Sequence, residues 1–271
     1  MMPKNLVIVR HGESEGNVVK QNLFHGDGSL YTEKFKERHD ANYRLSKLGV
    51  YQSKIAGEYI KENFGENFFD AAYTSYFIRA IETGCNLDLD IKWRIRYELI
   101  ERDWGELGTL SPSERDKKFP DWKRTKNEDP LFWRPQGGER MIDVQTRVKQ
   151  FIGTLHRQHT EENVLVVCHG EVSWGFRLLL ESISPMDYKI LDQSKKEFDR
   201  IHNCQILHYT RINPILENQE PSKKLEWIRS ICPWDDTKSS NKWQHINQEK
   251  KYSTEDLKAM YEKVPRIFSD F

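Results

Sequence analysis

Residues 6–17 read Leu-Val-Ile-Val-Arg-His-Gly-Glu-Ser-Glu-Gly-Asn, an apolar run followed at once by a polar turn that contains two glycines. The four apolar residues predict a short buried strand. The glycines let the backbone turn sharply and approach a ligand closely. Because ligands bind at the carboxyl ends of strands in open α/β sheets, Arg10, His11 and Asn17 fall where a site is expected. A planar, permanently charged guanidinium beside an imidazole suits a phosphate group.

Strand-like and helix-like segments alternate along the rest of the chain. Ser46 and Ser111 have the features of helix N-caps, and Gly65 is expected to end the first of these helices. The expected strands cover residues 6–9, 70–75, 91–97, 164–168 and, as the last one, 204–209. The expected helices cover residues 47–64, 76–87, 112–119, 139–156 and 170–180, with one more starting at 184. This alternation predicts an α/β fold with three layers, α/β/α, around a mostly parallel central sheet.

Two segments interrupt the alternation. Residues 18–44 have no clear period, and we expect an insertion there: a long excursion between the first strand and the first helix. Residues 213–271 contain four prolines, three tryptophans and one predicted helix at 253–264. Tryptophan is scarce in disordered segments, which favours an extension packed on the core. We therefore expect a catalytic domain at residues 1–212 and a C-terminal extension at 213–271.

The composition limits which partners and which cellular compartment are expected. The 271 residues carry 42 Lys and Arg against 42 Asp and Glu, so bulk charge gives no argument for nucleic acid or an anionic membrane. No apolar run is long enough to span a bilayer, and the N-terminus has no signal-peptide pattern. The four cysteines form no zinc-type pair, so we expect neither a metal nor another cofactor. Free thiols and the missing signal favour the cytoplasm.

The opening motif resembles the signature of the histidine phosphatase superfamily, the phosphoglycerate-mutase-like proteins. Members of that family carry R-H-G-E-S with an Asn shortly after, as residues 10–14 and Asn17 do here. Further pieces follow in the family's order. Residues 75–83, SYFIRAIET, are similar to the family's S-x-x-x-R-A-x-x-T stretch, and residues 168–170, Cys-His-Gly, match its second histidine motif. The resemblance covers about residues 4 to 210.

The resemblance implies a phosphoryl-transfer site with His11 as the nucleophile. A neutral imidazole is competent for this role because its unperturbed pKa is about 6.5. Its other ring nitrogen must stay protonated, which a backbone carbonyl in the Gly12 turn would enforce. His169, protonated beside a dianion, would add a third cationic donor to those of two arginines. The implied phosphate-binding residues are Arg10, Asn17, Arg79, His169 and Gly170.

Glu101 falls where the family often places its proton donor. It would protonate the leaving alkoxide and later deprotonate water, which requires a raised pKa and hence partial burial. Glu98, Asp103 and Glu106 are neighbours that could serve instead. Taken singly, the other residues also fit simpler interpretations: Arg79 an exposed helix residue, and His169 a hydrogen-bonded structural histidine.

Three functions fit these patterns. The first is a metal-independent phosphomonoester hydrolase, the second a phosphoglycerate mutase that uses the same phosphohistidine, and the third a non-catalytic interaction protein on this fold. The hydrolase is favoured because residues 18–44 are longer and more charged than the corresponding region of the mutases and lack Trp, which predicts a wall that admits water. The expected partner is a small-molecule phosphomonoester. Cations at Lys117, Lys118 and Arg134 suggest an acidic or polyphosphorylated one.

Overall fold

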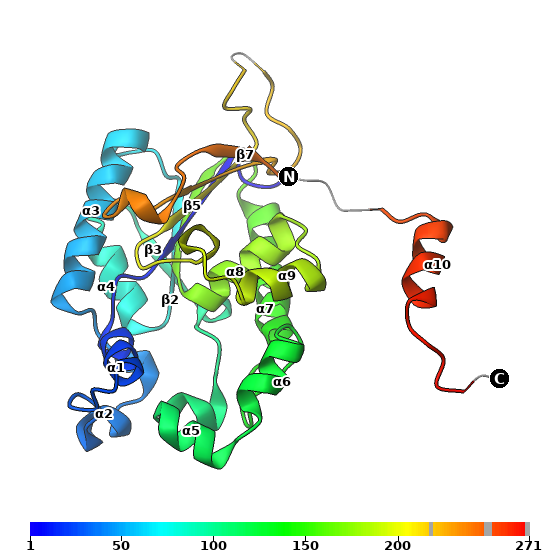
Figure 1. Ribbon diagram of the computed structural model, residues 1–271. Coiled ribbons are helices and arrows are strands. Elements are labelled where there is room, and N and C mark those ends of the chain that lie inside the picture. The colour runs from blue at the N-terminus through cyan, green and yellow to red at the C-terminus, as the bar shows by residue number, and fades with distance from the viewer. Residues whose placement is uncertain (217–218, 247–250, 269–271) are drawn as a thin grey trace.

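A computed structural model describes residues 1–216, 219–246 and 251–268. A seven-stranded sheet runs through its centre in the order β3-β2-β4-β1-β5-β6-β7 (Figure 1). The four strands from β3 to β1 pair in parallel, and the other three add to them in antiparallel fashion. In this order the strands span Trp93–Arg96, Ala71–Ser75, Asn163–Cys168, Asn5–Arg10, Ile206–Thr210, Trp227–Ile231 and Trp243–His245. The α/β fold with a parallel centre is confirmed.

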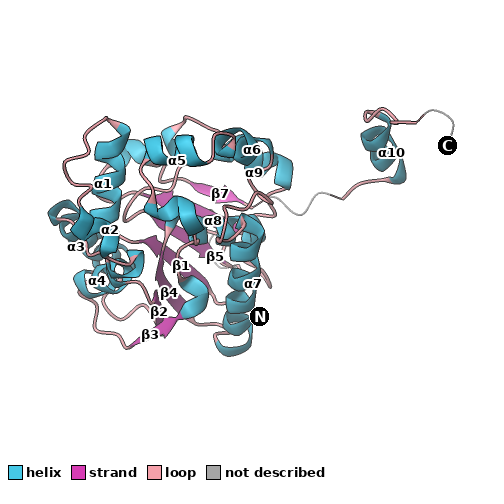
Figure 2. Cartoon of the chain, turned by 90° about the horizontal axis from the view of Figure 1, so that it is seen from below, coloured by secondary structure: helices cyan, strands magenta, loops and turns pink. Residues whose placement is uncertain are grey.

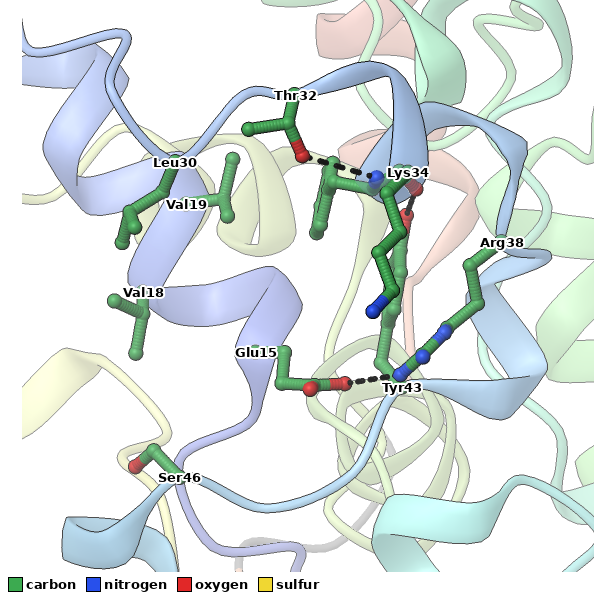
Figure 3. Close-up of a pocket in the computed structure, with 10 residues that line it drawn as sticks. Glu15, Val18, Val19, Leu30, Thr32, Lys34, Arg38, Tyr43 and Ser46 are labelled. Carbon is green, nitrogen blue, oxygen red and sulfur yellow. Dashed lines mark hydrogen bonds and ion pairs between the residues drawn. The ribbon is translucent and has the colours of Figure 1, made fainter.

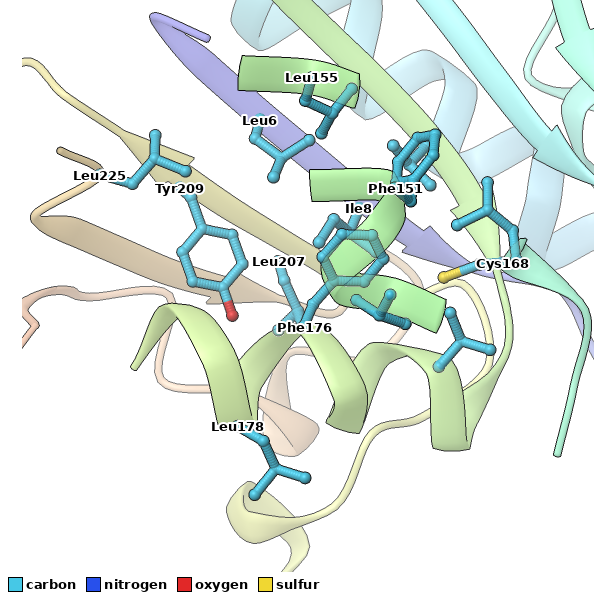
Figure 4. Close-up of a cluster of buried hydrophobic side chains, with 14 of the residues drawn as sticks. Leu6, Ile8, Phe151, Leu155, Cys168, Phe176, Leu178, Leu207, Tyr209 and Leu225 are labelled. Atoms are coloured by element: carbon cyan, nitrogen blue, oxygen red, sulfur yellow. The ribbon is translucent and has the colours of Figure 1, made fainter. Parts of the chain in front are cut away.

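Alternation along the central strands divides the core into two faces. Leu6 and Ile8 of β1 pack with helices α7 and α8 on one face, the cluster drawn in Figure 4. Val7 and Val9 point the other way, into a second cluster that includes residues of α3 and α4. Successive side chains of a strand point to opposite faces, so a fully apolar strand needs cover on both. Helices on both sides of the sheet, visible in Figure 2, complete the three layers.

The helices follow the predicted caps closely. Ser46 and Ser111 each accept a hydrogen bond at the start of a helix, and Gly65 ends α3 with a φ of 94°. No helix within the described residues is both long and apolar enough to cross a membrane. The helices are α1 Glu15–Phe24, α2 Glu33–Glu37, α3 Lys47–Phe64, α4 Ile78–Asn86, α5 Pro112–Lys118, α6 Trp122–Glu128, α7 Met141–Gln158, α8 Gly170–Leu180, α9 Pro185–Asp192 and α10 Thr254–Glu262.

The expectation that the first helix comes only after residues 18–44 is wrong. The first helix, α1, begins at Glu15, only five residues after β1, and α2 follows within the same segment. A capping box starts α1, in which Ser14 and Asn17 exchange hydrogen bonds between side chain and backbone. Only Gly16 and Val19 of α1 are buried. With so narrow a buried face, the helix has no apolar stripe, and its sequence therefore shows no helical periodicity.

The expectation that residues 204–209 form the last strand is also wrong. β6 pairs with β5 and β7 pairs with β6, so the chain after residue 212 adds two strands to the sheet edge. Both are short, and only Ile228 and Ile231 of the two strands are buried, which weakens the strand pattern in the sequence. Helix α10 begins at Thr254, one residue after the predicted start, with Ser253 as its N-cap, and stands away from the sheet (Figure 1). All described residues from 251 onward are exposed.

Candidate active site

The predicted site residues meet at one edge of the sheet because neighbouring parallel strands end there. Arg10 is the last residue of β1 and pairs in register with Cys168, the last residue of β4. His11 and His169 therefore leave the sheet side by side, with ring centroids 5.0 Å apart. β2 lies on the other side of β4, and helix α4 after it carries Arg79 to the same edge.

His11 is held in one tautomer. Its Nδ1–H donates to the carbonyl oxygen of Gly12 at 2.7 Å, as the sequence predicted for this turn. A carbonyl can only accept, so Nε2 keeps its lone pair. Burial lowers the pKa of His11 well below its ordinary value, and the positive charges of Arg79 and Arg10 lower it further. The imidazole is therefore neutral, the form that can attack phosphorus.

The turn that carries His11 is fixed against the start of α3. A Cβ added to Gly12 would lie 2.4 Å from the carbonyl oxygen of Gly49, so only glycine allows this approach. The Gly12 amide donates to Thr83 Oγ1 at 3.0 Å, and the Ser46 hydroxyl donates to the Glu13 carboxylate at 2.6 Å. Close backbone packing of this kind holds the nucleophile rigidly.

Two guanidinium groups flank His11. Arg79 is 6% exposed; its Nε donates to His11 Nε2 at 3.3 Å and its Nη1 to the carbonyl oxygen of Asp40 at 2.7 Å. Arg10 donates from Nη1 to the Ile201 carbonyl, while its buried Nε has no hydrogen-bond partner among the described residues. Gly170 lies directly against this group, since a Cβ there would be 3.5 Å from Arg10 Nε.

His169 is fully buried at the end of β4. Its Nε2 lies 2.8 Å from Ser75 Oγ, and its buried Nδ1 is left without a partner in the part of the chain that the structure describes. Burial lowers the pKa of His169 well below its ordinary value, with a further contribution from Arg79. The surrounding protein groups thus favour a neutral ring. The protonated form expected from the sequence requires the added negative charge of a bound dianion.

The Glu101 side chain lies close to both histidines. One ligand-type atom from each of Glu101, His11 and His169 lies within 4.8 Å of the others. Glu101 Oε1 accepts hydrogen bonds from the backbone amides of Arg102 at 3.0 Å and Glu171 at 3.2 Å, the latter in the first turn of α8. These two hydrogen bonds fix the position of the carboxylate.

Two of the three alternative acidic residues, Asp103 and Glu106, are engaged in other interactions. Asp103 is exposed and accepts from the Gly105 amide at 2.7 Å, and Glu106 pairs with Lys118 at 2.5 Å. Two histidines and a carboxylate are also a set that can bind a metal ion. Here, however, a guanidinium already donates to His11 Nε2 and a second one lies alongside, so the site fits an anion better than a cation.

Asn17 and Asn203 connect His11 to helix α1 through hydrogen bonds. Asn17 Oδ1 accepts from the amide and hydroxyl of Ser14 and from Asn203 Nδ2, so its predicted role as a phosphate donor would fall to its amide nitrogen. Asn203 Nδ2 also donates to the His11 carbonyl oxygen at 3.0 Å. Sequence reasoning missed Asn203, because it lies outside every motif. Ser75 opens a motif that the sequence did reveal, but its contact with His169 was not foreseen.

A separate pocket lies on the other side of α1. It has a volume of about 420 Å³, and none of the predicted site residues lines it. Glu15, Val18 and Val19 of α1 face it (Figure 3), together with Phe35 and Tyr43, whose rings stack at 4.6 Å. These α1 residues lie on the opposite side of the helix from Asn17.

Known proteins resemble this chain in both sequence and fold. Residues 6–207 match the family model described as histidine phosphatase superfamily (branch 1). The 2,3-bisphosphoglycerate-dependent phosphoglycerate mutase of Nitrobacter hamburgensis is 34% identical over 205 residues, which cover 68% of this chain and 84% of that protein. The enzyme of the same name from Sinorhizobium fredii is 32% identical over 197 residues, 68% of this chain and 82% of that protein.

Solved structures with a similar fold include phosphatases. The native structure of mycobacterial glucosyl-3-phosphoglycerate phosphatase has a TM-score of 0.59 at 20% identity, covering 89% of this chain and 96% of that one. Phosphoserine phosphatase from Entamoeba histolytica, in complex with 3-phosphoglyceric acid, has a TM-score of 0.56 at 20% identity, with coverage of 76% and 90%. At such low identity these likenesses concern the fold alone.

Proposed function

Because this chain belongs to the histidine phosphatase superfamily, branch 1, a family of phosphotransfer enzymes, we propose that it is a metal-independent phosphomonoester hydrolase with a phosphohistidine intermediate on His11. One observation carries the proposal. The lone pair of His11 Nε2 lies among Arg79, Arg10 and His169, while its Nδ1–H is held by the Gly12 carbonyl. That is a neutral nucleophile surrounded by donors for phosphate oxygens.

Each step of the proposed reaction uses groups placed around this nitrogen. His11 Nε2 attacks phosphorus, the bond from phosphorus to the leaving oxygen breaks, and Glu101 supplies the proton that the alcohol takes away. Glu101 then accepts a proton from water as the water oxygen attacks phosphorus, and the phosphorus–nitrogen bond breaks to release phosphate. Arg10, Arg79 and His169 hold the non-bridging oxygens in both steps. Gly170 lies beside the Arg10 guanidinium at the start of α8.

The position of helix α10 supports water as the acceptor. Helix α10 lies apart from the sheet in both views (Figures 1 and 2), so in this conformation it does not cover the site. Water at roughly 55 M competes well for a phosphoenzyme unless a lid excludes it.

Phosphoglycerate mutase activity is the second candidate, and the curated relatives named above favour it. A non-catalytic protein is disfavoured because the nucleophile, the cationic groups and an acid lie together. We further propose a small-molecule phosphomonoester as the partner, with neither nucleic acid nor membrane involved, and the cytoplasm as the compartment. The four free cysteines support that compartment.

Whether water or a second substrate molecule accepts the phosphoryl group distinguishes the hydrolase from the mutase. The enzyme is incubated with 3-phosphoglycerate and catalytic 2,3-bisphosphoglycerate, and the products are followed by phosphorus NMR. We expect inorganic phosphate, with little 2-phosphoglycerate. Fast interconversion of the two monophosphates, with a phosphoenzyme that persists for minutes, would establish the mutase instead.

Rapid quench with a labelled phosphomonoester tests the shared chemistry. An acid-labile, base-stable phosphoenzyme is expected in the wild type and not in His11→Ala, with circular dichroism to verify that the variant is folded. EDTA is expected to leave the rate unchanged. A phosphoserine or aspartyl phosphate, or a loss in EDTA that one metal restores, would refute the mechanism.

A further inference from the structure

The backbone on either side of His11 is held by hydrogen bonds from different parts of the chain. On the amide side, the His11 N–H donates to the carbonyl oxygen of Cys168 in β4 at 2.9 Å. On the other side, the His11 carbonyl oxygen accepts from Asn203 Nδ2 at 3.0 Å and from the Cys204 amide at 3.3 Å. The sheet therefore fixes one peptide group of His11, and the segment just before β5 fixes the other.

The same segment, residues 201–205, also holds Arg10. Arg10 Nη1 donates to the Ile201 carbonyl at 2.5 Å, and the Arg10 amide donates to the Gln205 carbonyl at 3.1 Å. The Cys204 amide in turn donates to the Arg10 carbonyl at 3.0 Å. A guanidinium and an imidazole that meet one phosphoryl group must keep a fixed relation to each other, and a shared support provides it.

Cys204 has a backbone conformation that depends on its surroundings. Its φ is 50°, in the left-handed region that a residue with a side chain rarely adopts. Such a conformation costs free energy and persists only where the surrounding structure holds it, which is frequent at functional sites. At this turn, Asn203 Nδ2 and the Cys204 amide both reach the carbonyl oxygen of His11.

Trp234 supports this turn from the C-terminal extension. Its indole Nε1–H donates to the Asn203 carbonyl oxygen at 2.6 Å, and its ring packs against the buried cluster that contains Cys204 and Ile206. The Asn203 carbonyl belongs to the peptide group that leads into Cys204, so the hydrogen bond acts on the strained turn itself. Trp234 follows β6 and lies beyond residue 207, where the family match ends.

We propose that Trp234 is a positioning residue for the reaction, which holds His11 in place through Asn203. This inference rests on the proposed function, in which His11 Nε2 attacks phosphorus. A displaced imidazole would reach the attacking geometry less often, while Arg79 and His169, held by contacts of their own, would still bind the phosphoryl group. Loss of the indole N–H should therefore slow the attack more than it weakens substrate binding.

Trp234→Phe tests the proposal, because it removes the indole N–H and keeps an aromatic ring. Trp227→Phe is the matched control: Trp227 is a half-buried tryptophan of the same extension, and its ring packs against His245 at 5.0 Å, away from the turn. Rapid quench with p-nitrophenyl phosphate measures phosphoenzyme formation at saturating substrate, and thermal unfolding verifies that both variants are folded.

Trp234→Phe should slow phosphoenzyme formation roughly ten-fold and change KM less than about two-fold. Trp227→Phe should leave both quantities unchanged. A loss confined to KM, or equal effects of the two substitutions, would overturn the proposal.

A double substitution tests the route through Asn203. Asn203→Ala should slow phosphoenzyme formation roughly ten-fold, since the His11 carbonyl loses a donor. Adding Trp234→Phe to Asn203→Ala should cost less than about a further two-fold, because the contact that the indole supports is already gone. Multiplied losses, roughly a hundred-fold together, would show that the two residues act independently and would overturn the proposed route.

A spectroscopic measurement separates this inference from the proposed function. The Nδ1 proton of His11, held by the Gly12 carbonyl at 2.7 Å, should give a proton NMR resonance that is missing in His11→Ala. Trp234→Phe should shift this resonance or speed the exchange of the proton with water, and Trp227→Phe should leave it unchanged.

The two hypotheses can then fail separately. If the resonance responds to Trp234→Phe alone but no phosphoenzyme forms on any substrate, the proposed function fails and the positioning of His11 stands. If a phosphoenzyme forms on His11 but Trp234→Phe behaves like the Trp227→Phe control in both measurements, the hydrolase stands and the positioning role is refuted.

Discussion

Glu101 owes its position to main-chain groups and not to a paired side chain. Its Oε1 accepts from the amides of Arg102 and Glu171, so the carboxylate is aimed before any substrate arrives. Arg102 is itself fixed, since it is 2% exposed and donates to the carbonyls of Glu139 and Trp133. The acid of the proposed reaction therefore sits on a rigid support.

Replacing Glu101 by Gln should have a cost that depends on the leaving group. An alkyl phosphate needs its departing oxygen protonated, so its phosphorylation step should slow by roughly 10²–10⁴. p-Nitrophenyl phosphate leaves as a stable anion and should lose far less. Both rates are read as phosphoenzyme formation in rapid quench. Equal losses on the two substrates would transfer the acid role to Glu98, Asp103 or Glu106.

His208 should make the protein less stable in acid. Burial lowers its pKa to about 3, with a contribution from Arg229, and its ring lies between Phe64 and Trp243. An unfolded histidine has a pKa near 6.5, so below that pH the unfolded chain takes up a proton that the folded chain does not. The free energy of unfolding should therefore fall as pH drops, by about 2 kcal/mol from this group between pH 6.5 and 5.

Urea unfolding at pH 7, 6 and 5 measures this effect. His208→Gln should show a shallower acid loss than the wild type, whereas His156→Gln, at an exposed position, should not change it. The same loss in all three proteins would mean that His208 does not contribute.

At the scale of single residues, the site residues that could be predicted from the sequence are those that follow a strand and belong to a motif. Arg10, His11, Arg79 and His169 come from three neighbouring parallel strands or the helix after one, so one motif per strand is enough to bring them together. Residues such as Asn203 escape this reasoning. Asn203 lies 192 positions from His11 in the sequence and donates a hydrogen bond to its backbone carbonyl. Such a contact leaves no pattern in the sequence around either residue.

At the scale of elements, the contact between β1's turn and helix α3 is the tightest backbone approach near the site. A Cβ on Gly49 would lie 1.9 Å from the carbonyl oxygen of Glu13. Gly49→Ala should therefore push α3 off the turn, costing about 2–4 kcal/mol of stability and lowering kcat/KM. Thermal unfolding and steady-state kinetics measure the two effects.

Gly153 in α7 provides the control, because a Cβ there meets only the end of the Arg157 side chain, at 3.3 Å. Gly153→Ala should leave activity unchanged and stabilise the helix by up to about 1 kcal/mol. If Gly49→Ala is as harmless as this control, the turn does not depend on α3.

The elements that the sequence predicted well are those with a buried apolar face and a polar cap. Helix α3 shows both: Ser46 and Gly65 bound it, and its buried residues include Ala56 and Ile60. Helix α1 has the cap but hardly any buried face, and β6 and β7 are short strands at one side of the sheet. Such elements are stabilised by contacts with the rest of the folded sheet, and these contacts leave no pattern in the local sequence.

At the scale of the molecule, the division at residue 212 remains a prediction, and two truncations test it. A chain that ends at residue 251 loses α10, whose described residues are all exposed, and should keep its melting temperature within about 2 °C. A chain that ends at residue 212 also loses β6 and β7, including the buried Ile228 and Ile231, and leaves β5 as an open edge. It should melt lower or aggregate. Equal stability of both chains would establish 1–212 as an independent domain.

The central place of β1 in the sheet has a consequence for how the protein is made. β1 is the first strand to leave the ribosome, yet both of its partners come late: β4 starts at residue 163 and β5 at residue 206. At 5–20 residues per second, the most apolar stretch near the N-terminus stays unpaired for roughly ten to forty seconds of synthesis. The nascent chain therefore carries an unpaired, strand-forming segment during this time, and Arg10 and His11 are the first site residues to be synthesised and among the last to be fixed in place.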